Sequence, residues 1–253
     1  MHITSWNVNS LNVRLPHVLQ YLRETAPDIL GLQELKQTDA AVDTTAIEAA
    51  GYHIATHGQK TYNGVALIAR EPLTDLVRGI PGYADEQARA IAASIGDVRV
   101  LNLYVPNGKA VGDEKYTYKL HWLDAATRYI DDLKREHPRL IITGDYNIAP
   151  ADLDVHDPDK WRDQILCSAP ERQALQNILA LGFKDAYRAL HPDTQQFSWW
   201  DYRMGGLRRN IGLRIDLTLA SDALALLDAG IDTAPRHWER PSDHAPAWVK
   251  IGT

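Results

Sequence analysis

The order of apolar and polar positions divides the chain into many short strands and a few helices. Apolar runs bounded by turn residues predict strands, and apolar residues at helical spacing predict helices. One helix is expected to begin after Ser10, its N-cap, and to stop at Pro27. Further helices are expected over 39–50, 114–136 and 168–182, and a short one just before Asp228. Strands are expected at 2–8, 28–33, 52–57, 64–70, 89–95, 98–105, 139–144, 197–202, 213–221 and 247–251.

Several of the predicted strands are joined in pairs by turn residues. Asn63-Gly64 and Gly96-Asp97 are typical of such connections. The helices are fewer than the strands and unevenly spaced. The pattern therefore favours an α/β architecture with mixed or antiparallel sheets over a doubly wound parallel sheet. If two sheets pack face to face, helices must cover their outer faces.

The strand predicted at 139–144 leads into a glycine, an acid and an amide. Gly144 is expected to let the backbone leave the sheet. Asp145 and Asn147 would then lie two residues apart at the edge where open sheets keep their binding crevices. Gly, Asp and Asn also favour ordinary turns, because of local hydrogen bonding. This stretch alone therefore leaves both interpretations open.

Other predicted strands also end in polar residues. A single polar residue after a strand is usually a solvated turn residue, so none of them is decisive alone. Asp216 is more telling, because an acid inside an otherwise apolar strand must find a partner. The polar strand-end residues are Asn7, Asn9, Glu34, Tyr104, Asn107, Asp145 and Asn147, with Asp243 and His244 just before the last strand.

Composition narrows the class of protein. The 253 residues, 45% of them hydrophobic, suit one soluble domain with a sizeable core or two small ones; no linker divides them, so a single domain over 1–253 is expected. The single cysteine, Cys167, excludes an intrachain disulfide and favours a reducing cytoplasm. No signal peptide or membrane-spanning run is expected. The net charge of −6 argues against a nucleic-acid partner unless a local basic patch overcomes it.

Seven motifs in order resemble the exonuclease III family of abasic-site endonucleases and 3′-exonucleases, within the DNase I-like endonuclease/exonuclease/phosphatase superfamily. Each motif is weak alone, but the ordered set is specific and spans residues 3 to about 249. The resemblance implies a four-layer α/β sandwich of two packed sheets flanked by helices. The motifs are Trp6-Asn7-Val8-Asn9, Leu32-Gln33-Glu34, Tyr104-Val105-Pro106-Asn107-Gly108, Gly144-Asp145-Tyr146-Asn147, Phe197-Ser198-Trp199-Trp200-Asp201-Tyr202-Arg203, Gly212-Leu213-Arg214-Ile215-Asp216 and Ser242-Asp243-His244-Ala245-Pro246.

The resemblance implies a metal site. Glu34 would be the main ligand of a catalytic Mg²⁺ or Mn²⁺, hard cations that prefer oxygen ligands. Asn9 stands where some relatives have an acid, so it would coordinate without adding charge. Asp243 would hold a second ion or support the first.

The resemblance also implies a centre for phosphodiester hydrolysis. Asp145 would orient and deprotonate the attacking water, with Asn147 beside it. His244, kept charged by its partner Asp216, would donate to a phosphate oxygen as the transition state develops. Further donors around the phosphate would be Asn7, Tyr104 and Asn107.

Substrate recognition would lie around the fifth and sixth motifs. By resemblance, Trp199, Leu213 and Ile215 would wall an apolar pocket for a flipped-out sugar without its base, although such residues in strands are more often core. Tyr62 and Asn63 would lie on a loop facing DNA. A local basic patch near the pocket favours phosphate contacts. It consists of Arg203, Arg208, Arg209 and Arg214, with Lys109, Lys115 and Lys119 as an extension.

The leading hypothesis is a Mg²⁺-dependent DNA repair phosphodiesterase, acting as a cytoplasmic monomer on double-stranded DNA. It would cut 5′ to abasic sites, remove 3′ blocking groups, or remove 3′ nucleotides, in each case leaving a 3′-hydroxyl. The 150–170 loop, including Leu166, departs from relatives and would bias the balance of these activities. Two alternatives stay open. One is a phosphatase for phosphoinositides or other small phosphate esters, and the other is a DNA-binding module that has lost catalysis.

Overall fold

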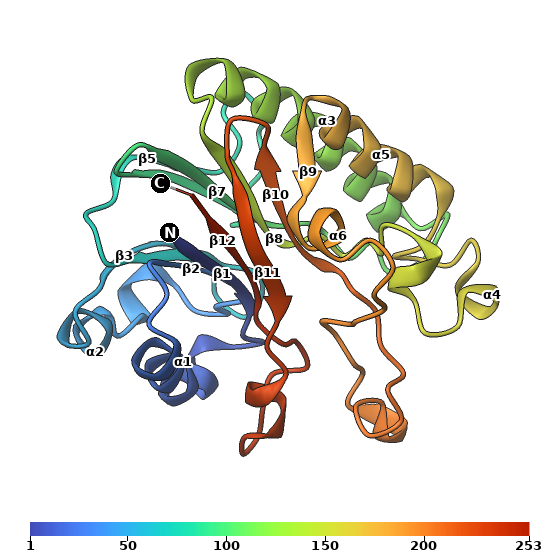
Figure 1. Cartoon of the computed structure of the whole chain (residues 1–253), viewed down its shortest axis with the longest axis horizontal. Coiled ribbons are helices and arrows are strands. Elements are labelled where there is room, and N and C mark those ends of the chain that lie inside the picture. Colours follow the sequence, from blue (N-terminus) through green and yellow to red (C-terminus); the bar gives the residue numbers. More distant parts are fainter. Residues whose placement is uncertain (253) are drawn as a thin grey trace.

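Two six-stranded β-sheets make up the centre of the computed structural model, which describes residues 1–252 (Figure 1). The first sheet contains β1 (His2–Asn7), β2 (Ile29–Gln33), β3 (His53–His57), β4 (Val65–Ala69), β11 (Leu226–Ile231) and β12 (Ala247–Ile251). Its strand order is β11-β12-β1-β2-β4-β3. Only β1 and β2 in this sheet run parallel.

The second sheet has the same mixed character. It contains β5 (Thr74–Arg78), β6 (Ala90–Ile95), β7 (Val98–Tyr104), β8 (Leu140–Asp145), β9 (Phe183–Asp185) and β10 (Asp216–Ser221). Its order is β5-β6-β7-β8-β10-β9, and β7 and β8 are its parallel pair. The prediction of mixed sheets is therefore confirmed.

Helices cover the outer face of each sheet. In Figure 1, α1 (Leu11–Thr25) and α2 (Thr44–Ala49) lie on one outer side, while α3 (Glu114–Glu136) and α5 (Ala169–Ala180) lie on the opposite side. The shorter helices are α4 (Pro158–Trp161) and α6 (Ala186–Leu190), and 3₁₀ turns occur at Asp39–Ala41, Asp152–Asp154, Arg203–Gly205 and Ala234–His237. No helix within residues 1–252 is long and apolar enough to cross a membrane.

The apolar core forms three layers. Between the sheets, Ile3 and Leu67 of the first sheet pack in one cluster with Val100 and Ile141 of the second. A second cluster joins α1 and α2 to the first sheet. A third joins α3 and α5 to the second sheet. These layers confirm the four-layer sandwich.

The structure differs from the local predictions in three places. Ser10 is at the N-cap position of α1, as predicted, but its φ is 89° and its side chain makes no capping hydrogen bond. Residues 197–202 form no strand. Trp199 makes only isolated β-bridges, one to Leu213 and one to His244. The helix expected before Asp228 is instead strand β11, because pairing with β12 overrides local preference.

Gly144 also has a different purpose from the one predicted. The backbone stays in the sheet through this residue, which pairs with Leu217 on one side and Leu103 on the other. Its φ is 153°, and a Cβ there would collide with the backbone of Leu103. Glycine is therefore required for close approach of two strands, and the strand continues as far as Asp145.

A polar contact joins the two sheets beside the apolar core. Gln33 of β2 donates through Nε2 to Oδ1 of Asn102 on β7 at 2.6 Å. Asn102 donates through Nδ2 to the carbonyl oxygens of Leu32 and Ala66, each at 2.9 Å. All of these groups are buried. The contact, which we term the intersheet amide pair, fixes how β7 sits against the first sheet.

Candidate active site

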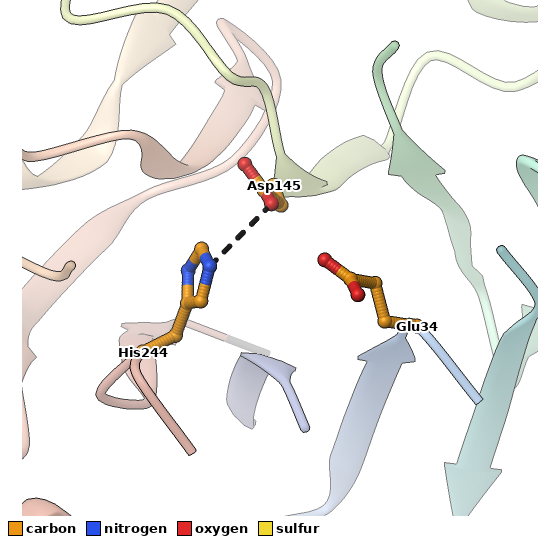
Figure 2. Close-up of side chains that lie close together, drawn as sticks. All are labelled: Glu34, Asp145 and His244. Atoms are coloured by element: carbon orange, nitrogen blue, oxygen red, sulfur yellow. Dashed lines mark ion pairs between the residues drawn. The ribbon is translucent and has the colours of Figure 1, made fainter. Parts of the chain in front are cut away.

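Polar side chains from both sheets meet at one end of the sandwich. Figure 2 shows Glu34, Asp145 and His244 pointing toward one another from three separate elements. Their possible ligand atoms all lie within 4.8 Å of one another. The residues that contact this group or belong to it are Asn7 at the end of β1, Glu34 after β2, Tyr104 at the end of β7, Asp145 at the end of β8, Asp216 at the start of β10, and His244 before β12.

Asn7 links the two carboxylates. Its Nδ2 donates to Oε1 of Glu34 and to Oδ2 of Asp145, each at 2.9 Å. Its Oδ1 accepts from the backbone N–H of Asn9 at 3.0 Å. With its amide engaged on both sides, this fully buried residue holds the two acids at a fixed separation.

His244 lies between two acids. Its Nδ1 is 2.8 Å from Oδ2 of Asp216, and its Nε2 is 3.8 Å from Oδ2 of Asp145. Burial lowers the pKa of His244, but the negative charges of Asp216 and Asp145 outweigh this effect and raise the pKa to about 10. The imidazole is therefore a charged proton donor at neutral pH.

Asp145 has the opposite character. Burial is the main cause that raises its pKa, to about 7, while the charge of His244 and the hydrogen bond from Asn7 act to lower it. Its Oδ1 accepts from the backbone N–H of Asn147 at 2.9 Å. A carboxylate with a pKa near neutrality is suited to accept a proton from water.

Tyr104 and Asn107 extend the site from the strand β7 side. The Tyr104 hydroxyl donates to Oε1 of Glu34 at 2.9 Å. Burial and the charge of Glu34 hold the pKa of this tyrosine well above its usual value, so it stays a donor. Nδ2 of Asn107 donates to Oδ1 of Asn147 at 3.1 Å. The structure thus brings Asn107 of the third motif together with Asn147 of the fourth.

Backbone strain gathers at the same place. Asn9, Glu34 and Asn147 have φ values of 45°, 57° and 49°. Asparagine tolerates this left-handed region, but glutamate rarely adopts it. Residues held in such conformations cost about 1–3 kcal/mol each and cluster at functional sites. The strain therefore supports a functional origin of the cluster.

The Glu34 side of the site has oxygens suited to a cation. Nζ of Lys36 lies 2.8 Å from Oε2 of Glu34 and donates to Oδ1 of Asn9 at 2.6 Å. Burial raises the pKa of Glu34, but the charge of Lys36 and the hydrogen bond from Asn7 lower it overall. Two oxygens thus converge on one positive group, which fits a hard cation. The charged imidazole of His244 fits a metal ligand poorly, because both ring nitrogens carry hydrogens.

Asp243 supports this arrangement from behind. Its Oδ1 accepts from Nδ2 of Asn9 at 3.0 Å, and its Oδ2 accepts from Nε1 of Trp199 at 3.0 Å. With both oxygens engaged, Asp243 orients the Asn9 amide so that its oxygen faces Nζ of Lys36. This contact suits a supporting residue better than a second metal ligand.

Two hollows flank the site. One, of about 480 Å³, is lined by Trp199 and Leu213 together with Trp161 and Arg209. Ile215 is buried beneath it in the same apolar cluster. The other, of about 500 Å³, is lined by Tyr104 and by the predicted contact residues Tyr62, Asn63 and Asn107, with Lys109 and Lys115.

Part of the predicted basic patch is not on the surface. Arg214 is fully buried and pairs with Asp154 and Asp185, each at 2.7 Å. Lys119 is also fully buried and pairs with Glu171. These two predictions were wrong, because each side chain is buried against acidic partners from other parts of the chain. Arg203, Arg208 and Arg209 are exposed, and Arg203 pairs with Asp201 at 2.6 Å.

Sequence reasoning missed several residues around the site. Lys36 contacts Glu34 directly, two positions after it in the chain. Arg89 donates to the Tyr104 carbonyl at 3.2 Å and lies over the Tyr104 ring, 5.0 Å from its centroid. Ser242, which belongs to the last motif but was given no role, donates to the Asn7 carbonyl at 2.6 Å. The available signal for Lys36 was its spacing of two from a candidate ligand, and that for Ser242 was its place in the last motif. Arg89 has no local signal.

Comparisons with known proteins agree in family and fold. Residues 4–244 match the model of the Endonuclease/Exonuclease/phosphatase family. The chain is 39% identical to exodeoxyribonuclease III of Haemophilus influenzae, over 99% of this chain and 100% of that protein. It is similar to the 3′ phosphatase NExo from Neisseria, bound to a product DNA hairpin, with 46% identity, full coverage of both chains and a TM-score of 0.99. An AP endonuclease from Archaeoglobus fulgidus gives 36% identity, full coverage of both chains and a TM-score of 0.97.

Proposed function

Because the chain belongs to the endonuclease/exonuclease/phosphatase family, we propose that it is a Mg²⁺-dependent DNA repair phosphodiesterase. It would cleave duplex DNA 5′ to abasic sites and remove 3′ nucleotides or 3′ blocking groups, leaving a 3′-hydroxyl. The observation that carries this proposal is that Asp145, whose pKa is raised to about 7, lies next to the charged imidazole of His244 and the oxygens of Glu34. One catalytic domain would span 1–253.

The cation would be held by Glu34 and Asn9, whose oxygens converge in this structure on Lys36. Mg²⁺ fits best, because it is commonly held by one or two protein oxygens together with substrate phosphate and water. When bound, it would supply charge stabilisation for the phosphate oxygens. Asp243 would keep the Asn9 amide turned toward it.

The chain's own side chains would perform the proton transfers. Asp145 would accept the proton of the attacking water. Its carboxylate is held in place by the Asn147 N–H and the Asn7 amide. The imidazolium of His244, fixed by Asp216, would donate a hydrogen bond from Nε2 to a non-bridging phosphate oxygen as negative charge develops there. Tyr104 and Asn7 would keep Glu34 in place and supply donors near the phosphate.

The two hollows would bind DNA on either side of the scissile phosphate. Tyr62, Asn63 and Asn107 line one of them. Trp199 and Leu213 line the other, with Ile215 beneath, and would receive a sugar lacking its base. Arg203, Arg208 and Arg209, exposed near this second hollow, would contact phosphates and offset the negative net charge.

A cleavage assay on labelled duplexes tests the proposal. One duplex carries a single abasic analogue, the second a recessed 3′ end, and the third a 3′-phosphate. We expect products ending in a 3′-hydroxyl with Mg²⁺, and none after EDTA. Asp145→Asn should lower the rate by about a hundredfold or more. Asp132→Asn, an exposed acid on α3, should leave it unchanged.

An inositol phosphate incubated in parallel tests the phosphatase alternative. Turnover of that ester, together with no cleavage of any duplex, would overturn the proposal. DNA binding without cleavage by the wild-type chain would favour the inactive module instead. Light scattering on the purified protein tests the further expectation of a monomer, and cell fractionation tests the cytoplasmic location.

A further inference from the structure

A buried ion pair lies directly behind the candidate site. Lys119 of α3 and Glu171 of α5 contact each other, and neither side chain is exposed to solvent. Removing two charges from water is unfavourable, and apolar residues of similar volume often stabilise a fold equally well. A buried pair is therefore weak evidence for stability, which points to a geometric purpose.

All three hydrogens of the Lys119 ammonium group are used. Nζ donates to the carbonyl oxygen of Asn107 at 3.2 Å, to that of Asn147 at 2.7 Å, and to the Glu171 carboxylate. Asn107 follows β7 and Asn147 follows β8. One ammonium group thus joins the two loops that supply these asparagines.

Glu171 is equally well satisfied. Its Oε1 also accepts from the backbone N–H of Leu166 at 3.0 Å. Its Oε2 accepts from the N–H of Ser168 at 3.0 Å and from the Ser168 hydroxyl at 2.6 Å. The carboxylate therefore ties the end of the 150–170 loop to Lys119. Because every donor and acceptor has a partner, the network is rigid and specific in geometry.

The positions that Lys119 holds are those that orient the proposed base. Asn147 has φ 49° and donates its N–H to Oδ1 of Asp145. Asn107 donates to the Asn147 side chain. Gly108 lets the loop lie against the lysine stem, since a Cβ there would come within 3.1 Å of Cδ of Lys119. Lys119 therefore holds both asparagines through their backbone carbonyl groups.

We propose that Lys119, anchored by Glu171, is a positioning residue that sets Asn107 and Asn147, and through Asn147 the carboxylate of Asp145, for hydrolysis. The inference rests on the proposed nuclease function. It predicts that loss of the ammonium group slows the chemical step more than it weakens binding, because Lys119 touches no substrate.

Lys119→Met tests this inference, with Lys134→Met as matched control. Lys134 lies on the same helix and also donates to two backbone carbonyl groups, those of Leu181 and Gly182, away from the site. Both full-length variants are assayed on the abasic duplex for kcat, KM and Tm. We expect Lys119→Met to lower kcat at least tenfold with KM within about threefold, and Lys134→Met to keep kcat within about twofold. Lys119→Arg, which retains donors for the carbonyl groups, should recover part of kcat.

Two results would overturn the inference. One is an Lys119→Met enzyme whose kcat matches that of Lys134→Met. The other is a parallel loss of kcat and Tm in both variants, which indicates a merely structural effect. If Lys119→Met does not fold, Glu171→Gln takes its place, and wild-type kcat in that variant counts against the inference. Failure of the proposed function is distinct, because the wild-type enzyme would then cleave none of the duplexes.

Discussion

Asp216→Asn should move the alkaline limit of activity to lower pH. Nδ1 of His244 lies 2.8 Å from Oδ2 of Asp216, and the pKa of His244 is raised to about 10. Loss of one opposite charge at this distance lowers a pKa by about 1–3 units. The pKa of His244 in the variant should therefore be roughly 7 to 9, a change of about 1.4 kcal/mol for each unit.

The direction of the pH shift depends on which protonation state of His244 is active. The imidazolium exists below the pKa of His244 and is lost as pH rises through it. A raised pKa also stabilises the folded chain, an effect fully present below the ordinary pKa of 6.5 and lost as pH rises through about 10. Asp216→Asn should reduce this effect, so its loss of stability relative to wild type is greatest at acidic pH.

Single-turnover cleavage of the abasic duplex from pH 6 to 10 measures the shift. Wild type should keep its activity across most of this range, whereas Asp216→Asn should lose activity with a midpoint between about pH 7 and 9. The shape of the profile is the readout, since the variant will also be slower at every pH. An exposed acid changed in the same way, Asp132→Asn, should not move the profile. An Asp216→Asn profile with the wild-type alkaline limit would refute the assignment of a charged His244.

Three further outcomes are expected. Glu34→Gln should lower Mg²⁺-dependent cleavage about a hundredfold, while gel shifts without metal should show unchanged DNA binding. Glu48→Gln, at an exposed position on α2, is the control. Cleavage by Glu34→Gln at the wild-type rate would contradict the metal assignment. Arg214→Met leaves Asp185 without its cation and Asp154 with Arg188 alone, so thermal unfolding should show a loss of about 3–5 kcal/mol. The exposed Arg162→Met should show no such loss, and equal Tm values would argue against the buried network. Arg208→Ala with Arg209→Ala should raise KM and reduce the salt dependence of binding by about two phosphate contacts; a slope as steep as wild type would remove both arginines from the interface.

The strand pattern and the ordered motifs were enough to predict the fold. The helix expected over 114–136 begins and ends at those two residues in the structure. The capping box of Ser168 and Glu171 is also present. Where local preference and tertiary pairing conflicted, pairing won. Residues 226–231 form a strand because they pair with β12, although the sequence there favours a helix.

The site was predictable as a set of residue types but not as a set of contacts. Motif order gathered Glu34, Asp145 and His244, which the structure brings within 4.8 Å. Charge alone misled at Arg214 and Lys119, because both side chains are buried and find acidic partners far along the chain. Partners separated by tens of residues, such as Glu171, have no local pattern to reveal them. The catalytic roles themselves remain predictions.

The intersheet amide pair has a consequence for how DNA must adapt. Gln33 directly precedes Glu34, and Asn102 lies two residues before Tyr104, whose hydroxyl contacts Glu34. The width of the site is therefore set by buried contacts before any substrate arrives. Because these contacts are buried, we expect the distortion on binding to fall on the duplex. Cleavage rates on different sequences should follow the ease of unstacking, with flexible pyrimidine–purine steps and frayed ends cut fastest.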